Sequence, residues 1–391
     1  MSRSSIATIV VSLALLTSAC WIDSSDVDHE TSGHQIPKTN IVSVLQFTDD
    51  GSDDYVTSLA VTEEALWVGT ERSVYEVRYS FDPPELSVVQ RHEDAVSEAE
   101  VNSLRIDGHD VLVASTQGFA RYSAGAWSRH DVGNINDVLR VGNDLWAATN
   151  NGLEILRGGS REWLPLEVTS ITDHFPTRKM LSMETDNTST VWVGSEFGLH
   201  RFDLAAHANI RQRMDAVSTG ALQSGEIDIG NLWTRLYGAY QNPSGGLITT
   251  IEGNSHLEGN RIERIRWDDQ SNRFAFCTER SVTLLQDSRW TSYSGTTEIL
   301  ALSPSGELTR RSSTGNVGIP TGEVYDVVFS GSDLWLATRS GLALVKEDRT
   351  ANLFTIADGL PSNGIRALDR LPGSNYLFAG TDHGIALVRV R

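Results

Sequence analysis

The sequence is poor in cysteine, methionine and proline. Among its 391 residues are two cysteines, four methionines and ten prolines, against ten tryptophans. Cys20 directly follows an apolar N-terminal segment, so Cys277 has no partner for a disulfide inside a folded domain. The balance of tryptophan against proline and methionine favours β structure over helical bundles.

Most linear signatures of enzymes are also absent. The sequence has no P-loop, dinucleotide fingerprint, H-E-x-x-H or C-x-x-C motif. It has no G-x-S-x-G elbow either, because the glycine pairs of that spacing enclose Glu196, Pro320 or Asp382. No cofactor and no catalytic residue is predicted, although loops distant in the sequence can meet on one face of a repeat fold.

Positive charge is scarce. Lys and Arg number 32 against 51 Asp and Glu, which gives a formal net charge of −19. Such a surface repels phosphate backbones, so nucleic acid is not an expected partner. Charged residues make up 21% of the chain and hydrophobic residues 39%, a composition that supports a large buried core.

The N-terminal residues have the pattern of an export signal. Arg3 supplies a positive charge, Ile6 to Leu16 form an apolar run too short to span a bilayer, and Thr17-Ser18-Ala19 precede Cys20. Small residues before a cysteine resemble the bacterial lipobox, in which that cysteine becomes the lipid-modified N-terminus. Thr17 departs from the lipobox pattern, which favours leucine at that place. The alternative is an ordinary signal peptide cut nearby.

The resemblance implies a signal peptide over residues 1–19 and a lipid anchor on Cys20, which would hold the protein on the extracytoplasmic side of an envelope membrane. Residues 20–38 are polar and acidic and are predicted to form a flexible tether. Residues 39–391 are predicted to form the folded domain, and we expect a monomer.

Short internal repeats dominate this domain. Each copy is an apolar strand that ends in a small residue followed by Ser or Thr, and four residues beyond the small residue stands Gly or Ser before an apolar residue. The seven strands are Leu66–Thr70, Val111–Ser115, Leu145–Thr149, Val191–Ser195, Phe274–Thr278, Leu334–Thr338 and Leu377–Thr381. The offset predicts a β-hairpin with a tight turn.

Other strands flank each hairpin. A short alternating strand precedes it, and an aromatic residue after several copies, namely Trp127, Trp163, Trp290 and Phe354, fits an outer fourth strand. Four strands per repeat at a spacing near 40 residues predict an all-β propeller. A weak further copy at Leu247–Thr250 and a degenerate stretch at 298–319 favour eight blades, with seven as the alternative.

The last copy carries a resemblance to a known family. Gly359-Leu360-Pro361-Ser362-Asn363, followed by Ile365–Leu368 and Phe378–Thr381, resembles the repeat of two-component-regulator propellers, which form the extracytoplasmic sensor of hybrid histidine kinases. The last copy has no outer strand of its own, so Ile41–Thr48 is predicted to supply it and to close the ring.

Propeller geometry places the turns between second and third strands around the channel on one face. We predict a candidate binding ring there that consists of Glu71, Arg72, Gln117, Asn150, Asn151, Glu196, Phe197, Glu279, Arg280, Arg339, Asp382 and His383. Polar hairpin turns of any propeller have a similar composition, which is the alternative interpretation.

Three other features have two interpretations each. Asp49, Asp50, Asp53 and Asp54 form a weak calcium candidate or a solvated acidic turn. Trp67, Trp146, Trp192 and Trp335 repeat at one position, which indicates packing between blades rather than a carbohydrate platform. Cys277 replaces the small residue of its copy and is predicted to be buried.

The leading hypothesis is therefore a non-catalytic binding or scaffold lipoprotein with a protein or glycan partner on one propeller face. The alternatives are an accessory sensing module for a separate signalling kinase, as the resemblance implies, and a propeller lyase or hydrolase. An enzyme should bring three or more carboxylates, histidines or arginines together at the channel mouth.

Overall fold

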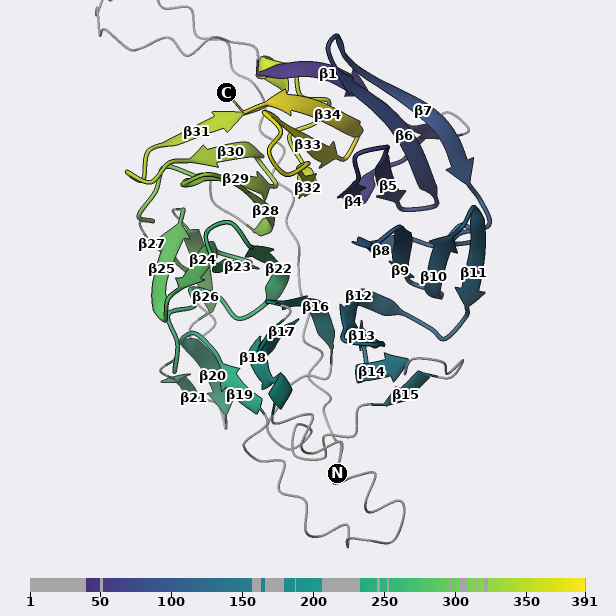
Figure 1. The fold of residues 1–391 in the computed structure, drawn as a ribbon. Coiled ribbons are helices and arrows are strands. Elements are labelled where there is room, and N and C mark those ends of the chain that lie inside the picture. Colours follow the sequence, from purple (N-terminus) through teal and green to yellow (C-terminus); the bar gives the residue numbers. More distant parts are fainter. Residues whose placement is uncertain are drawn as a thin grey trace, which may run out of the picture. The chain divides into compact units, whose positions relative to one another are not determined.

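The structure is a computed structural model of the chain, and its strands form a ring (Figure 1). It describes residues 40–49, 52–156, 163–165, 179–186, 188–205, 233–244, 247–251, 253–295, 297–302, 308–313, 315–319 and 323–390. The predicted signal peptide, the tether and Cys20 lie outside the described residues. Residues 39–391 cluster as one compact unit.

Seven four-stranded antiparallel sheets, here blades 1 to 7, make up the ring. Blades 1 to 3 are β4 to β7 (Val56–Val61, Leu66–Thr70, Val74–Phe81, Pro84–His92), β8 to β11 (Val101–Asp107, Asp110–Ser115, Gly118–Ser123, Ala126–His130) and β12 to β15 (Ile135–Val141, Asp144–Thr149, Gly152–Leu156, Trp163–Pro165). Blades 4 and 5 are β16 to β19 (Met180–Thr185, Thr190–Ser195, Gly198–Asp203, Trp233–Leu236) and β22 to β25 (Ile262–Asp268, Arg273–Thr278, Ser281–Gln286, Arg289–Ser294). Blade 6 is β28 to β31 (Val324–Ser330, Asp333–Thr338, Gly341–Val345, Ala351–Phe354), and blade 7 combines β32 to β34 (Ile365–Asp369, Tyr376–Thr381, Gly384–Arg389) with β1 (Ile41–Leu45).

The favoured count of eight blades is wrong. The weak copy belongs to β21 (Leu247–Ile251), which pairs only with β20 (Tyr240–Ser244). The degenerate stretch likewise forms a two-stranded hairpin of β26 (Thr297–Leu302) and β27 (Leu308–Ser313). A third such pair joins β2 (Thr48–Asp49) and β3 (Ser52–Asp53). A two-stranded hairpin supplies no inner strand to the hub, so these segments are insertions between elements of the ring.

The N-terminal strand closes the ring, as predicted. β1 pairs antiparallel with β34, with Leu45 opposite Ile385 and Ile41 opposite Val388. Blade 7 therefore takes its outer strand from the opposite end of the described chain (Figure 1). The strand is shorter than the predicted Ile41–Thr48, because Thr48 belongs to the β2–β3 hairpin.

The repeated Ser or Thr caps the turn between the second and third strands. In blade 6, the hydroxyl of Thr338 donates to the carbonyl of Gly341 at 2.7 Å and accepts from the amide of Ser340 at 3.2 Å. Thr70, Ser115, Thr149, Ser195 and Thr278 each donate to the carbonyl three residues on. Gly341 has φ +150°, a conformation that favours glycine. This explains why the turn recurs with a fixed length.

The small residue at the end of each second strand allows neighbouring blades to approach closely. A Cβ placed on Gly194 would lie 2.6 Å from Ile262 Cγ2, on the inner strand of the next blade. Gly380 has the same relation to Val56 across the closing seam, at 2.5 Å. Cys277 occupies this place in blade 5 and is fully buried, as predicted.

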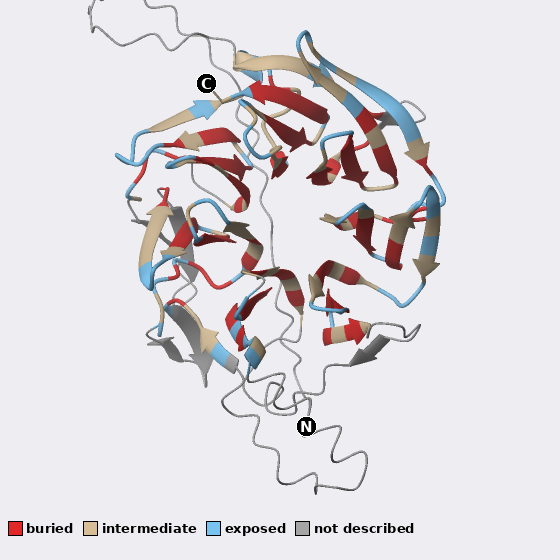
Figure 2. Ribbon diagram, in the orientation of Figure 1, coloured by how far each residue is buried: buried red, intermediate tan, exposed pale blue. Residues whose placement is uncertain are grey.

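The tryptophans of the second strands belong to the core, as predicted. Trp67, Trp146, Trp192 and Trp335 are between 0% and 6% exposed. Trp146 makes an edge contact with Phe202 at a centroid distance of 4.9 Å. Buried residues concentrate on the second and third strands of the blades, while exposed residues lie on outer strands and turns (Figure 2). The aromatics predicted for an outer strand all lie on one, in β11, β15, β25 and β31.

We expect Gly194→Ala to destabilise the protein by about 1–3 kcal/mol, since the added methyl group overpacks the contact with Ile262. Urea unfolding measures this effect. Gly318→Ala is the matched control, because a Cβ at Gly318 meets nothing within 4 Å. Equal stability of the two variants would contradict the close-packing explanation.

Candidate functional site

All seven inner strands carry a β-bulge at their second residue. The pairing of each inner strand with its neighbour skips this residue, as between Val56 and Ser58 in β4. The first residue of each strand packs against the preceding blade, and the bulge turns the second one towards the channel. The skipped residues are Thr57, Asn102, Asn136, Leu181, Glu263, Tyr325 and Arg366.

These seven residues line one pocket with a volume of about 270 Å³, here the channel-mouth pocket. Its remaining lining residues are Glu100, Val101, Arg261 and Arg264. The pocket therefore draws on every blade of the ring. No histidine or cysteine is among these lining residues, but two carboxylates and three arginines converge there. This gathering meets the criterion set above for an enzyme, and binding sites gather such groups as well.

Most of the charged groups in the pocket already have a partner. Arg261 pairs with Glu263, and Arg366 pairs with Asp382 at 2.5 Å and lies over the ring of Tyr55. Glu100 accepts a hydrogen bond from the Tyr55 hydroxyl at 3.3 Å. Burial raises the pKa of Tyr55 to about 12 and also raises the pKa of the Glu263 carboxyl.

Two donors in the pocket remain unsatisfied. The Oγ1 atom of Thr57 and the Nε atom of Arg264 are buried and have no hydrogen-bond partner among the residues that the structure describes. A buried donor without an acceptor costs about 1–3 kcal/mol, so such groups indicate a site for water or a ligand. The pocket thus presents free donors, while each of its two carboxylates already has one partner.

The predicted ring of twelve turn residues lies at the same end of the ring as this pocket, since inner strands begin where the second-to-third-strand turns lie. Three of the twelve, Asn150, Glu279 and Asp382, contact pocket residues through their side chains: Asn150 accepts from Asn136 at 3.0 Å, and Asp382 pairs with Arg366. Glu279 accepts from the amides of Asn260 and Arg261.

The other turn residues have local roles. Glu71 pairs with Arg72, and Glu196 pairs with Lys179. Phe197 lies under the guanidinium of Arg235, and the amide of His383 donates to the Thr381 hydroxyl. The backbone carbonyl of Gln117 accepts from Gly133, and the amide of Arg280 donates to Thr278. Asn151 bonds Thr149 through its amide, and Arg339 lies in the β29–β30 turn. None of the twelve lines the pocket.

The predicted ring therefore lies at the same end of the propeller as the channel-mouth pocket but includes none of the residues that line it, and ligand binding by the ring stays a prediction. The bulge that turns these residues inward is not visible in the sequence, because the inner strands show the same alternation of apolar and polar residues as an ordinary strand. An alignment of the seven inner strands against each other would show it as a variable, mostly polar position directly after a buried apolar one.

The acidic cluster near the N-terminus is only partly described. Asp50 lies outside the described residues, and of Asp49 and Asp53 only the backbone is described, in β2 and β3. Asp54 is 1% exposed and accepts from the Thr70 hydroxyl at 2.7 Å, and burial raises its pKa. Within the described parts of the chain, no group of three or more metal-ligating side chains is placed to hold a metal ion. Calcium binding stays a prediction.

Below the pocket, two arginine clamps tie the inner strands together. Arg105 of blade 2 binds Asp137 of blade 3 through two hydrogen bonds of 2.7 and 3.0 Å and also bonds Glu184 of blade 4. Asp137 in turn accepts from the amide of Met183 at 2.8 Å. The arginine lowers the pKa of the fully buried Asp137 against the opposing effect of burial.

The same arrangement recurs across blades 5 to 7. Arg266 binds Asp326 at 2.6 and 2.8 Å and reaches the carbonyl of Leu368. Asp326 accepts from the amide of Leu368 at 3.0 Å. Blade 1 joins the ring through Ser58, which accepts from the Leu104 amide, and through the Val61 amide, which donates to Asp369 at 2.7 Å.

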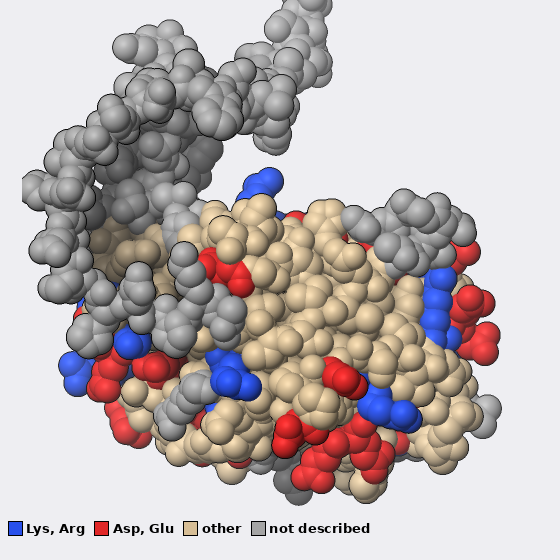
Figure 3. All heavy atoms as spheres, turned by 90° about the horizontal axis from the view of Figure 1, so that it is seen from above, with Lys and Arg blue, Asp and Glu red and all other residues tan. Residues whose placement is uncertain are grey.

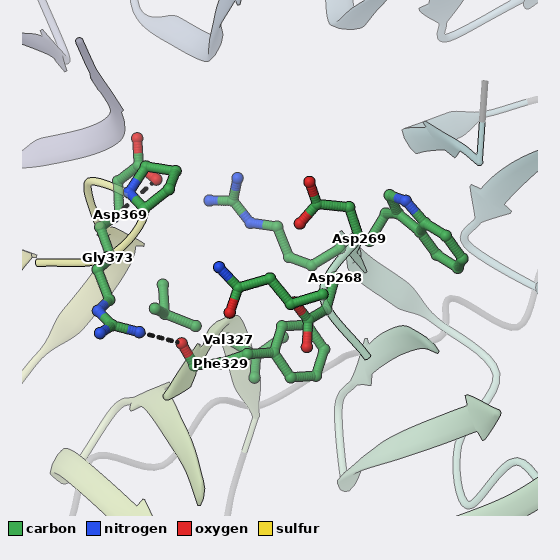
Figure 4. Close-up of a pocket in the computed structure, with 12 residues that line it drawn as sticks. Asp268, Asp269, Val327, Phe329, Asp369 and Gly373 are labelled. Carbon is green, nitrogen blue, oxygen red and sulfur yellow. Dashed lines mark hydrogen bonds between the residues drawn. The ribbon is translucent and has the colours of Figure 1, made fainter. Parts of the chain in front are cut away.

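A second pocket, of about 180 Å³, opens at the opposite end of the inner strands (Figure 4). Asp268 and Asp269 approach it from blade 5, Phe329 from blade 6, and Asp369 and Gly373 from blade 7. Asp268 accepts hydrogen bonds from Ser271 and Arg273. The lining is rich in carboxylates, in contrast to the free donors at the channel mouth.

The outer surface carries no continuous basic patch on the side shown in Figure 3, where acidic and basic side chains are interspersed. That nucleic acid is not a partner, as expected from the net charge, stays a prediction. None of the helices in the described residues is both long and apolar enough to span a membrane.

The Asp369 carboxyl gives the protein a predicted pH dependence. Burial raises its pKa from 3.8 to about 6, so the folded state binds this proton more tightly than the unfolded state does. The stability of the protein relative to Asp369→Asn should therefore fall by about 2 kcal/mol as pH rises from 4 to 7. Urea unfolding at several pH values measures it, with the exposed Asp269→Asn as control. A constant difference between wild type and Asp369→Asn across this range would contradict it.

Comparison with known proteins supports the fold. No family model and no curated protein matches the sequence. Among solved structures, the extracellular domain of BT4673 from B. thetaiotaomicron, described as a one-component system, is similar with a TM-score of 0.57 and 15% identity over 88% of this chain. The extracellular domain of BT3049 from the same organism, described as a hybrid two-component system, has a TM-score of 0.54 and 14% identity over 87% of this chain. This chain covers 40% of each of those chains. At such identities the likeness concerns the fold alone, and the chain therefore shares its propeller fold with extracellular domains of one- and two-component systems, as the repeat resemblance implied.

Proposed function

We propose that this protein is a non-catalytic binding propeller that is anchored to an extracytoplasmic membrane surface through Cys20 and binds a protein or glycan partner at the channel mouth. One observation carries the proposal: seven bulges direct one side chain from each blade into a single pocket that retains unsatisfied donors. Buried donors without acceptors at a pocket shared by all seven blades mark a place where a ligand can supply the missing acceptors.

The state of the charged groups favours binding over catalysis. A general acid or base needs a titratable group that is free to exchange a proton with a substrate. In this pocket Glu100 bonds Tyr55 and Glu263 pairs with Arg261, and no histidine lines the wall. The free groups, Thr57 and Arg264, are hydrogen-bond donors suited to holding a ligand.

A sensing role is the second candidate. The similar solved structures are extracellular domains of signalling systems, and this propeller could act as an accessory module for a separate kinase. In that case ligand binding should change the affinity of the propeller for a membrane-bound partner. A pull-down of envelope proteins with and without ligand separates the sensing module from a plain binding protein.

The binding proposal predicts that Leu181→Trp abolishes ligand binding, because the larger ring fills the channel-mouth pocket. Glycan and peptide arrays probed with the full-length protein identify ligands, and the variant is then tested against each. Leu353→Trp is the control, since Leu353 is 39% exposed on the outer strand β31. Ligands that bind Leu181→Trp as well as wild type would move the site away from the channel.

The anchoring proposal predicts that Cys20→Ala shifts the protein from the membrane fraction to the soluble fraction, because the acyl chains provide the stable attachment. Cell fractionation with immunoblotting measures the distribution. Cys277→Ala is the matched control, as Cys277 is buried in the propeller. Membrane association of Cys20→Ala equal to that of wild type would contradict lipidation.

A further inference from the structure

We infer that the channel-mouth pocket receives a single carboxylate group of the proposed protein or glycan partner, and that Arg264 is the residue that binds it. This inference rests on the proposed function and names the chemistry of the ligand. It follows from the placement of Arg264, from the carboxylates around it and from the unsatisfied donors.

Arg264 differs from the residues at the equivalent position of the other inner strands. It follows the bulge in β22, at the position where Asp137 and Asp326 stand in blades 3 and 6. At the other blades this position holds serine or alanine, namely Ser58, Ser103, Ser182 and Ala367. Of the seven residues that directly follow a bulge, Arg264 is therefore the one cation, and it lines the pocket.

The neighbouring carboxylates do not pair with Arg264. Its charge lowers the pKa of both Asp137 and Asp326, so it lies within electrostatic range of the two. Each of those carboxylates, however, is held by two hydrogen bonds from another arginine, Arg105 or Arg266. Among the described residues Arg264 forms no ion pair and its buried Nε has no acceptor.

A carboxylate is the ligand group that fits this guanidinium. The planar guanidinium can donate two parallel N–H bonds to the two oxygens of one carboxylate, which is stronger and more directional than a neutral hydrogen bond. The free hydroxyl of Thr57 lines the same pocket and adds a third donor. A pocket of about 270 Å³ is below the usual range for drug-sized ligands, so only one small group of the partner, such as a single acidic sugar or amino-acid unit, enters it.

The two glutamates of the lining restrict the ligand further. Glu100 and Glu263 offset two of the three arginine charges in the lining, Arg261, Arg264 and Arg366, so its formal charge of +1 balances one ligand carboxylate better than a dianion such as phosphate. The glutamate oxygens can accept hydrogen bonds from hydroxyl or amide groups of the ligand. The pocket therefore suits a monocarboxylate that also carries hydrogen-bond donors.

Two sources offer this chemistry, an acidic sugar and an amino-acid-like acid. The test uses matched probes that differ in the carboxylate: D-glucuronate against D-glucose, and N-acetylglycine against its amide. Isothermal titration of the full-length protein in detergent measures each affinity. We expect at least one acid to bind at least about tenfold more tightly than its neutral partner, and the pair that shows the difference identifies the source.

Three variants test the role of Arg264 in this discrimination. Arg264→Gln should remove the preference for the acid, and Arg264→Lys should weaken it, since an ammonium cannot form the bidentate contact. Arg289→Gln makes the same charge change at an exposed residue on the outer strand β25 of the same blade and should keep the preference. Thr57→Val removes the hydroxyl donor of Thr57 without changing charge and should reduce the affinity for the acid. Melting temperatures of all variants identify any loss of folding.

The outcomes separate this inference from the proposed function. Equal binding of acid and neutral probes, or an acid preference that survives Arg264→Gln in a folded protein, overturns the carboxylate assignment. If neither acid binds while array ligands bind wild type and not Leu181→Trp, the pocket is a binding site for another chemistry and the inference alone fails. If no array ligand depends on Leu181 either, the proposed function fails as well.

Discussion

The burial of both faces of each blade against its neighbours is the constraint on which this fold depends. The second strands of the blades are almost entirely buried, so each four-stranded sheet needs a partner on either side. Close approach is possible because the strand ends in glycine, alanine or cysteine where the next blade inserts an aliphatic residue, as Gly194 receives Ile262. With every sheet requiring two neighbours, a ring is the arrangement that leaves no blade uncovered, and β1 completes it.

At the hub, the inner strands join by side chains rather than by a shared sheet. Asp137 and Asp326 each accept an amide hydrogen bond from the next blade while they hold an arginine of the preceding one. Buried ion pairs of this kind carry a large desolvation cost, and the additional amide bonds help to offset it. Ser58 and Asp369 make the corresponding links at blade 1. The network fixes the positions of the inner strands and thereby the shape of the channel.

The same architecture makes the binding site. A bulge at the second residue of each inner strand separates the residue that packs against the neighbouring blade from the residue that lines the channel. Packing therefore constrains the first of these residues, while the second is free to vary, from Thr57 and Leu181 to Glu263 and Arg366. A pocket built in this way can change its chemistry without changing the fold. The two ends of the channel also differ, with free donors at one and a carboxylate-rich lining at the other.

The sequence alone determined the β-propeller, its hairpin repeat, the closing strand, the buried tryptophans and the face that carries the turns, because all of these depend on local spacing of apolar, small and turn residues. The number of blades and the lining of the pocket were decided only in three dimensions. The segment at Leu247–Ile251 has the local pattern of a strand but pairs only within a hairpin, and Arg264 lies in an ordinary alternating strand. Whether a strand joins the hub, and which side chain a bulge turns inward, depends on its contacts with distant blades, and the spacing of residues within one repeat does not encode those contacts.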